Sequence, residues 1–434
     1  MFKINSTLNK IMNNALVVLS GNVGANIFGL LSVTIFTKSM GAEIFGYYVL
    51  FITIVEVVDK IFNFQTWQAF IKYATDFQVN GKSDKIMMLL KYCFLVDLFS
   101  LVVAAVIAYL SVDYFIDFFD IPIEYDYLLE IMAISLVFRV LGVSSGIFRL
   151  FDQFKLQSKI LVISALFKFS LYIIISILSP SFESFVYGSL FSQFIAFIMT
   201  LYGCKKVLND EKILINSIIK ERIEYDMMKE MKVFSFILYN NFDVSVRMVS
   251  RQLDIFVLGR LYGSEVVGVY RIAKDIVSVI GKVTDPIYQA IYPELAKLLA
   301  NGEVNAAKQV TFKISKYAGM AGLLLYVAFI FFGSMSISLF FGSDFTHAYN
   351  IVLVYFFAIL ISIVSLPLVP VLQSKGLAKE ALMNQIKATA CYLIVLYPLT
   401  NYLSSTGSAI SYIIFYVVWL VLTLKTIQEK KVFI

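Results

Sequence analysis

Apolar residues recur along this chain in stretches long enough to cross a membrane as helices. A helix needs ~20 apolar residues to span ~30 Å of hydrocarbon. The sequence contains twelve such stretches, at Asn14–Thr37, Ile44–Phe64, Ile86–Leu110, Tyr125–Phe148, Leu156–Leu178, Ser184–Gly203, Val233–Leu258, Val266–Tyr288, Tyr317–Phe341, Ala348–Leu372, Ala378–Leu399 and Ser408–Lys425. We therefore expect an all-α integral membrane protein with twelve transmembrane helices.

The distribution of basic residues agrees with this topology, because Lys and Arg concentrate on the cytoplasmic side of membrane proteins. With the N-terminus inside, twenty-four basic residues fall on segments predicted to be cytoplasmic, and the outer loops contain only Lys38 and Arg260. No small-residue cleavage site follows the first stretch, so we interpret it as helix one and not as a signal peptide. Both termini are expected in the cytoplasm.

Composition excludes most soluble classes of protein. Hydrophobic residues make up 59% of the 434 positions and charged residues 15%, whereas soluble proteins average ~25% charged residues. Cys93, Cys204 and Cys391 are far apart, His347 is the only histidine, and no nucleotide-binding or nucleophile motif follows a strand-like segment. The sequence therefore predicts no enzyme, no metal site and no resident cofactor. The modest net charge of +6 does not indicate a nucleic-acid partner.

A short motif occurs twice along the chain. Residues 38–48 read KSMGAEIFGYY and residues 260–270 read RLYGSEVVGVY, so Gly, Glu, Gly and Tyr coincide at an offset of 222. Each copy follows an odd-numbered helix, which predicts two six-helix bundles in the same orientation around a central cavity. Gly41 and Gly263 are expected to end a helix in the αL conformation, with Glu43 and Glu265 at the start of the next helix.

The repeat also sets the predicted domains. Residues 1–203 form an N-terminal six-helix bundle, residues 204–232 a cytoplasmic amphipathic linker, and residues 233–434 a C-terminal six-helix bundle. The linker alternates isoleucines with charged residues, which predicts an amphipathic helix lying at the membrane interface. We favour a plain connection over a regulatory element.

Eighteen ionisable residues lie inside the predicted spans, where each costs ~2.5–3.5 kcal/mol on insertion scales. The basic ones are Lys60, Lys91, Arg139, Lys168, Arg247, Arg251, Arg271, Lys274, Lys282 and Lys387. The acidic ones are Glu56, Asp59, Asp97, Glu130, Asp243, Asp254, Asp275 and Asp285. Such residues usually face an interior cavity, although pairs at (i, i+4) spacing can instead hold helices together.

Most of these charges share single helix faces at ~100° per residue. Polar stripes are predicted on helices one, two, seven and eight, which are equivalent pairs in the repeat. Candidate substrate-binding residues on them are Asn22, Asn26, Lys60, Arg247, Arg251, Arg271, Lys274 and Lys282. Candidate coupling or charge-balancing residues are Glu56, Asp59, Asp97, Asp254, Asp275 and Asp285. Arg and Lys suit phosphate oxygens, so the cations could hold a pyrophosphate and the acids could accept hydrogen bonds from sugar hydroxyls.

Three segments carry a resemblance to a known family. They are Ser20-Gly21-Asn22 through Gly41-Ala-Glu-Ile-Phe-Gly-Tyr-Tyr48, Ser144-Ser-Gly-Ile-Phe-Arg149 through Phe154, and Asp254-Ile-Phe-Val-Leu-Gly259 through Gly268-Val-Tyr270. The chain resembles the bacterial polysaccharide flippases (the O-antigen and capsule repeat-unit, or Wzx-type, group) of the multidrug/oligosaccharidyl-lipid/polysaccharide exporter superfamily.

This resemblance implies a V-shaped pair of bundles in the bacterial cytoplasmic membrane that work by alternating access. The implied substrate is an undecaprenyl-pyrophosphate-linked oligosaccharide, and polysaccharide polymerase and chain-length machinery are candidate partners. An ion-coupled multidrug antiporter of the same superfamily and a lipid II flippase are the alternatives, whereas a glycosyl polymerase or ligase would need a larger outer loop. A proton or sodium gradient is the candidate energy source. We expect a monomer in contact with membrane lipid.

Overall fold

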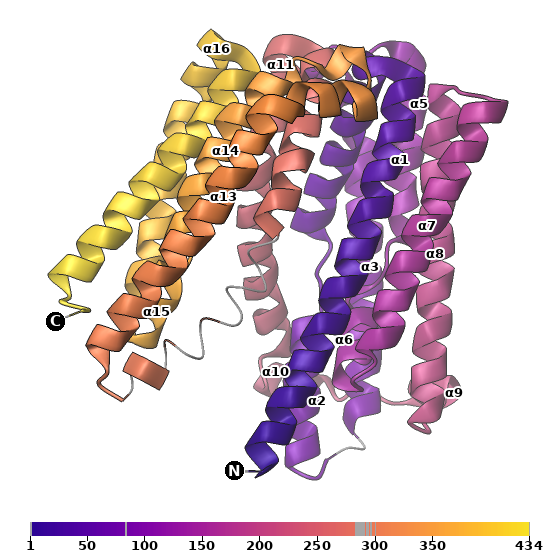
Figure 1. Cartoon of the computed structure of the whole chain (residues 1–434). Coiled ribbons are helices and arrows are strands. Elements are labelled where there is room, and N and C mark those ends of the chain that lie inside the picture. Colours follow the sequence, from indigo (N-terminus) through magenta and orange to yellow (C-terminus); the bar gives the residue numbers. More distant parts are fainter. Residues whose placement is uncertain are drawn as a thin grey trace. The chain divides into compact units, whose positions relative to one another are not determined.

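The computed structural model describes the backbone of residues 2–82, 85–282, 291, 295, 297–299 and 301–433. Within these ranges, the side chains of residues 2–12, 15, 243, 246, 247, 249, 250, 280–282 and 378 are not described. All secondary structure in the described part of the chain is helical (Figure 1).

The first half of the chain contains the elements α1 (Phe2–Phe62), α2 (Trp67–Val79), α3 (Lys85–Leu110), α4 (Val112–Phe118), η1 (Ile123–Tyr125), α5 (Asp126–Ile134), η2 (Ser135–Phe138), α6 (Gly142–Leu150), α7 (Phe154–Leu178) and α8 (Phe182–Asp210). The connection between the halves contains α9 (Ile215–Lys220) and α10 (Tyr225–Glu230). The second half contains α11 (Val233–Lys282), α13 (Val304–Phe341), η3 (Ser343–Phe345), α14 (Ala348–Ser365), α15 (Leu368–Ser374) and α16 (Ala378–Glu429).

Among the described residues, eight helical stretches are long and apolar enough to cross a membrane, and the longest of them covers 64 residues. A stretch of that length accommodates two spans at ~20 residues each. α1, α11 and α16 each contain a non-helical residue at which one span ends and the next begins, at Gly41, Gly263 and Ser404. α1 and α16 are among the eight stretches, and counting each of them twice gives ten spans. α11 is not among the eight, and its two segments bring the number to twelve, which confirms the predicted all-α membrane protein with twelve spans.

The two motif glycines have the same backbone conformation. Gly41 has φ 76° and ψ −177°, and Gly263 has φ 77° and ψ −172°. The positive φ agrees with the prediction, but the predicted αL conformation is wrong because ψ is extended and not near +47°. This combination is essentially confined to glycine, since a Cβ would clash with the backbone.

The two copies of the motif also contact each other reciprocally. A Cβ on Gly46 would overlap the carbonyl group of Ser264, and a Cβ on Gly268 would overlap the carbonyl oxygen of Ala42. Ser264 and Gly268 are the repeat equivalents of Ala42 and Gly46 at the offset of 222. Small residues spaced four apart allow two helix backbones to approach closely in a membrane. The internal repeat therefore has a counterpart in the packing of α1 against α11.

Two spans predicted to be continuous are interrupted, and the second span is followed by an additional helix. The second span of α1 ends at Phe62, close to the predicted end at Phe64, and α2 begins at Trp67. Within the predicted span Tyr125–Phe148, the η2 helix is separated from α6 by residues 139–141. Leu366 and Pro367 separate α14 from α15. Only the last interruption coincides with a proline, which cannot donate a backbone hydrogen bond.

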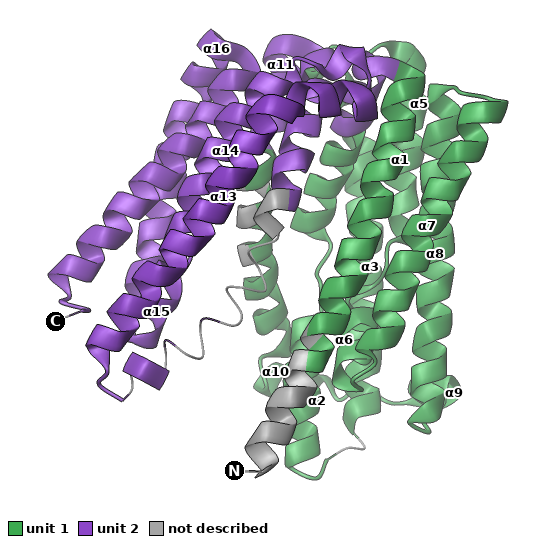
Figure 2. Cartoon of the chain, viewed as in Figure 1, with its two compact units in different colours: residues 1–40, 51–252 green, residues 41–50, 253–434 purple. Residues whose placement is uncertain are grey.

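The chain divides into two compact units by its internal contacts, residues 1–40 with 51–252 and residues 41–50 with 253–434 (Figure 2). The first span of α11 is thus divided between the units, as is the second span of α1. The two units are defined by the contacts within each of them, whereas the predicted domains are defined by the sequence repeat. The domain boundaries at 203 and 233 therefore stay a prediction.

The connection between the halves is not one amphipathic helix, as predicted, but two short helices packed onto the first unit. Ile218 of α9 and Met228 of α10 are 8% and 2% exposed within the hydrophobic core around α2, α3 and α6. The Lys91 ammonium donates to the carbonyl oxygens of Ile219 and Glu221, both at 2.7 Å, at the end of α9. A cation at a helix C-terminus satisfies carbonyls that have no partner within the helix.

Candidate functional site

The first unit contains a polar cluster at the point where two spans are interrupted. We call it the helix-break cluster; its members are Asp59, Lys60, Asn63, Asp97, Ser100 and Arg139. Asp59 is 1% exposed and lies one turn before the end of α1. Its carboxylate accepts hydrogen bonds from Asn63 Nδ2 at 2.8 Å and from Arg139 Nη1 at 3.2 Å. Lys60 Nζ lies 3.2 Å from the same Oδ2 atom that Arg139 contacts.

Asp97 of α3 joins the starts of the two interrupted helices. Its side chain is 0% exposed, and its two oxygens accept the backbone N–H groups of Thr66, at 3.1 Å, and Val143, at 2.6 Å. Thr66 is the N-cap of α2 and Val143 lies in the first turn of α6. Helix N-termini carry free N–H groups and about +0.5 elementary charge each. Two such ends therefore balance the single negative charge of Asp97.

The carbonyl groups at the end of α1 also have partners. Ser245 of α11 donates its hydroxyl to the Lys60 carbonyl at 2.8 Å, and Asn241 Nδ2 donates to the Ile61 carbonyl at 2.9 Å. Ser100 accepts the N–H of Phe64 at 3.0 Å. An unsatisfied backbone group costs several kcal/mol in hydrocarbon. Because side chains from three other positions satisfy these groups, the interruption is a defined part of the fold.

Two cations at this break share one buried carboxylate. Lys60 and Arg139 are each about a quarter exposed, at 25% and 27%, while the carboxylate that they share is buried. One turn earlier, Glu56 accepts a long hydrogen bond of 3.4 Å from Gln252 Nε2, and Arg251, the residue before Gln252, is exposed. Two partly exposed cations beside one buried carboxylate suit an anion.

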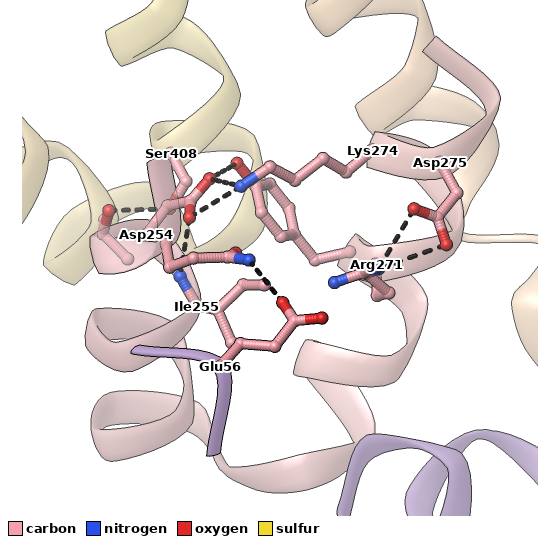
Figure 3. A network of polar contacts seen from close by, with 10 residues as sticks. Glu56, Asp254, Ile255, Arg271, Lys274, Asp275 and Ser408 are labelled. Atoms are coloured by element: carbon pink, nitrogen blue, oxygen red, sulfur yellow. Dashed lines mark hydrogen bonds and ion pairs between the residues drawn. The ribbon is translucent and has the colours of Figure 1, made fainter. Parts of the chain in front are cut away.

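The second unit has its own buried acid–base pair (Figure 3). Asp254 of α11 is 0% exposed, and Lys274 Nζ donates to both of its carboxylate oxygens, at 2.9 and 2.8 Å. The hydroxyl of Tyr270 donates to Asp254 Oδ2 at 2.7 Å, and the Ile255 N–H donates to Oδ1 at 2.9 Å. The charge of Lys274 is therefore matched within the protein by one carboxylate.

Tyrosines from several helices surround this pair. We call Tyr270, Tyr355, Tyr392 and Tyr412 the tyrosine cluster. Their ring centres lie 6.5 Å apart for Tyr270 and Tyr355, 4.7 Å for Tyr355 and Tyr412, and 4.9 Å for Tyr392 and Tyr412. Lys274 Nζ is 6.0 Å from the ring centres of both Tyr270 and Tyr412, which adds a weak cation–π attraction. The pair is bordered by tyrosine rings, with Asp254 fully buried and the Lys274 side chain 18% exposed.

The structure brings some predicted residues together and places others apart. Lys60 and Asp59 lie in the helix-break cluster with Asp97, and Lys274 is paired with Asp254. Arg271 Nε donates to both oxygens of Asp275, at 3.0 and 3.1 Å, one helical turn away. On α1, Asn22 is exposed and Asn26 is half-buried. Asp285 and the side chains of Arg247 and Lys282 lie outside the described residues.

Several residues near the helix-break cluster are not among the predicted binding residues. Arg139 is a predicted intramembrane cation but not a predicted binding residue. Asn241, Ser245 and Ser100 bond backbone groups at or just beyond the end of α1, and no spacing along the chain indicates these contacts. The tyrosine cluster draws on three helices, α11, α14 and α16, so no spacing along the chain indicates it. Within the described residues, no three His, Cys, Asp or Glu side chains gather to hold a metal ion.

Comparison with known proteins supports both the fold and a family. A family model described as "Polysaccharide biosynthesis protein" matches residues 35–350. Inner membrane protein YghQ of Escherichia coli (strain K12) is 23% identical over 350 residues, which is 79% of this chain and 95% of that protein.

Solved structures of membrane transporters share the fold over nearly the whole chain. Lipid II flippase MurJ, in an inward closed conformation, has a TM-score of 0.67 at 14% identity, covering 96% of this chain and 89% of MurJ. A multidrug resistance MATE family transporter of the MOP superfamily, in an inward-facing conformation, has a TM-score of 0.69 at 16% identity, covering 96% and 98%. These identities establish a common fold. The family model spans well over half of the sequence, and the chain is therefore a member of the polysaccharide biosynthesis protein family.

Proposed function

We propose that this protein is a flippase that moves undecaprenyl-pyrophosphate-linked oligosaccharide repeat units across a bacterial cytoplasmic membrane. The sugar passes from the inner to the outer leaflet by alternating access. The observation that carries this proposal is the pair of partly exposed cations, Lys60 and Arg139, that share the single buried carboxylate of Asp59 beside two interrupted helices. In transporters, interrupted helices commonly form the substrate site.

The chemistry of the helix-break cluster matches a pyrophosphate. Arg139 presents a planar fork of N–H donors and Lys60 a compact charge, and both suit phosphate oxygens. Asp59 holds the two cations in place when no substrate is bound, which limits the cost of charges at membrane depth. Hydrogen-bonding groups along the path can replace the water that the glycan loses, at several kcal/mol for each unsatisfied group.

Family and fold support the same proposal. The family is one of polysaccharide biosynthesis, and one protein of the same fold is a lipid II flippase. A transporter needs no covalent chemistry, so we propose a function without catalytic residues or a cofactor. Asp97, Asp254 and Glu56 stay the candidates for coupling to a proton or sodium gradient. A monomeric protein with both termini in the cytoplasm, working beside a polysaccharide polymerase and chain-length machinery, remains our expectation.

The experiment is to locate the lipid-linked glycan in cells with and without the protein. An impermeant lectin applied to intact spheroplasts reports glycan in the outer leaflet. We expect the glycan to become inaccessible when the gene is deleted and to return when it is restored. If glycan exposure is unchanged and sensitivity to cationic drugs rises, the protein is an antiporter. If peptidoglycan precursors accumulate inside instead, it acts on lipid II.

A further inference from the structure

The first unit contains an open cavity whose lining includes neither Lys60 nor Arg139. Its volume is about 530 Å³, within the range of ~300–1,000 Å³ typical of ligand pockets. Four helices line it: α1 contributes Asn22, α6 contributes Ser145 and Arg149, α7 contributes Gln157, and α8 contributes Ala196 and Thr200. All of these residues belong to residues 1–40 and 51–252, so the cavity lies inside one compact unit.

Arg149 provides a cation at this cavity. Its guanidinium carbon lies 4.1 Å from the centre of the Trp67 ring at the start of α2. Among the described residues, no carboxylate forms an ion pair with Arg149. Stacking on Trp67 occupies the flat face of the Arg149 guanidinium and leaves its N–H edges available for hydrogen bonds. The guanidinium remains charged at any physiological pH. An anion with several oxygens is the natural complement of such a group.

The neighbourhood of Arg149 is positively charged as well. The loop between α6 and α7 carries Asp152, whose carboxylate accepts a weak hydrogen bond of 3.4 Å from Asn14. Lys155 and Lys159 are exposed in the first turns of α7. This loop is on the side predicted to be cytoplasmic by the distribution of basic residues. Among the described side chains, an anion that approaches from the cytoplasmic leaflet therefore meets the cations Arg149, Lys155 and Lys159 and the acid Asp152.

The rest of the lining suits a hydrocarbon chain with a polar end. Phe148, Phe154 and Leu161 make most of the wall apolar. Asn22, Ser145 and Gln157 add side chains that form no hydrogen bond to another described residue. A free phosphate ion would contact only the polar end and leave the apolar wall in contact with water, which is unfavourable in proportion to its area. A ligand with both a phosphate and a chain satisfies both parts.

We propose that this cavity binds an anionic membrane lipid from the cytoplasmic leaflet, with the lipid phosphate on Arg149 and part of a chain against the apolar wall. This inference does not depend on the transported substrate, because binding is measured on the protein without transport. A lipid held between α1, α6, α7 and α8 would stabilise the packing of these helices, as any ligand stabilises the state that binds it.

The chain offers a built-in reporter for this test. It has two tryptophans, Trp67 and Trp419, so Trp419→Phe leaves the ring that Arg149 covers as the only indole. The purified variant in detergent is titrated with dioctanoyl-phosphatidylglycerol, with dioctanoylglycerol, which has the chains but no phosphate, and with inorganic phosphate. We expect a saturable change in Trp67 emission with phosphatidylglycerol. The other two probes should need at least about tenfold higher concentrations, corresponding to ~1.4 kcal/mol.

Substitutions separate the two parts of the site. Arg149→Gln in the same background should weaken phosphatidylglycerol binding by about tenfold, and Ala196→Leu, which fills the cavity, should weaken it with Arg149 still present. Lys205→Gln removes an exposed cation at the end of α8 and serves as the matched control. Circular dichroism and size-exclusion chromatography check that each variant is folded. The proposal is wrong if folded Arg149→Gln binds phosphatidylglycerol as tightly as the parent, or if inorganic phosphate alone reproduces the full response.

Discussion

The guanidinium of Arg139 lies 3.2 Å from the carboxylate of Asp59, a residue 80 positions earlier in the chain and on a different helix. This contact joins the two interrupted spans of the first unit at their breaks. It also leaves one buried carboxylate between two cations, because Lys60 contacts the same oxygen. The shared carboxylate of Asp59 therefore lowers the cost of holding Lys60 and Arg139 inside the membrane-spanning part of the protein.

Removing the shared carboxylate should destabilise the protein more than removing one cation. Asp59→Asn leaves Lys60 and Arg139 close together without their counter-ion. Removing one partner of a buried ion pair lowers the free energy of unfolding by ~3–5 kcal/mol. Because both cations are partly exposed, we expect the loss in Asp59→Asn to lie at or below the lower end of this range. The thermal transition of the purified protein, compared at one scan rate, should fall markedly for Asp59→Asn and only slightly for Arg139→Gln.

The double variant Asp59→Asn/Arg139→Gln provides the control. It removes one negative and one positive charge together, so its transition should lie above that of Asp59→Asn alone. If the double variant is less stable than either single variant, the ion pair is not the source of the effect.

Asp97 should stabilise the starts of α2 and α6. In Asp97→Asn, one acceptor oxygen becomes an amide donor that faces a backbone N–H. Leaving one buried donor unsatisfied costs ~1–3 kcal/mol. We expect a lower unfolding transition and faster hydrogen exchange in the peptides that contain Thr66 and Val143. Asp113→Asn, at an exposed position before the fold re-enters the membrane, should change neither quantity. Unchanged exchange at Thr66 and Val143 in Asp97→Asn would contradict this role.

The reciprocal glycine contact gives a third prediction. Gly46→Ala and Gly268→Ala each introduce a Cβ that overlaps backbone atoms of the opposite motif copy. Because backbone cannot rotate away as a side chain can, the two helices must separate, and both variants should be impaired in glycan export and in stability. Gly29→Ala is the matched control, since a Cβ there meets nothing within 4 Å. In a helix that substitution should stabilise by up to ~1 kcal/mol. Equal behaviour of the three variants would rule out close backbone packing as the reason for the motif.

The pair in the second unit leads to a fourth prediction. Lys274→Ala leaves the fully buried carboxylate of Asp254 with only the Tyr270 hydroxyl and one N–H group, so the yield of folded protein should drop. Arg271→Ala breaks an (i, i+4) pair whose members are 27% and 23% exposed. Such pairs contribute only ~0.3–0.5 kcal/mol, so the yield should be retained. Asp254→Asn/Lys274→Gln should recover part of the loss. Equal yields of Lys274→Ala and Arg271→Ala, measured by fluorescence-detected size exclusion, would show that the Asp254 pair is not structural.

The sequence predicted the parts of the fold that depend on local pattern. A stretch of about 20 apolar residues indicates a transmembrane helix, because that length is needed to cross the hydrocarbon of a membrane. The repeat offset of 222 identified Gly41 and Gly263 as equivalent positions between two spans. The predicted end of helix two at Phe64 is close to the end of α1 at Phe62. The break at Arg139–Leu141 could not be predicted in this way, since these residues include neither proline nor glycine. Asp97 accepts hydrogen bonds from the helix starts that follow both breaks, and it is 31 residues from Thr66 and 46 from Val143.

The same distinction applies to the candidate site. The charge stripe on helix two puts Asp59 and Lys60 on one helix face, and the structure places both in the helix-break cluster. It could not show that Arg139 shares their carboxylate, which requires the packing of two helices. Likewise, Lys274 was predicted to bind substrate from its face on helix eight. Its partner Asp254 lies on the preceding span, 20 residues away, so their pairing depends on how the two spans meet.

Transport through the helix-break cluster is measured with the purified protein in sealed vesicles. Undecaprenyl-pyrophosphate-linked oligosaccharide is incorporated, and an impermeant glycosidase is added outside after the outer pool has been removed. We predict that the protein renews the glycan on the outer face, that Lys60→Gln/Arg139→Gln abolishes this renewal in folded protein, and that Lys205→Gln retains it. Renewal at the same rate in protein-free vesicles, or in the double variant, would contradict the account.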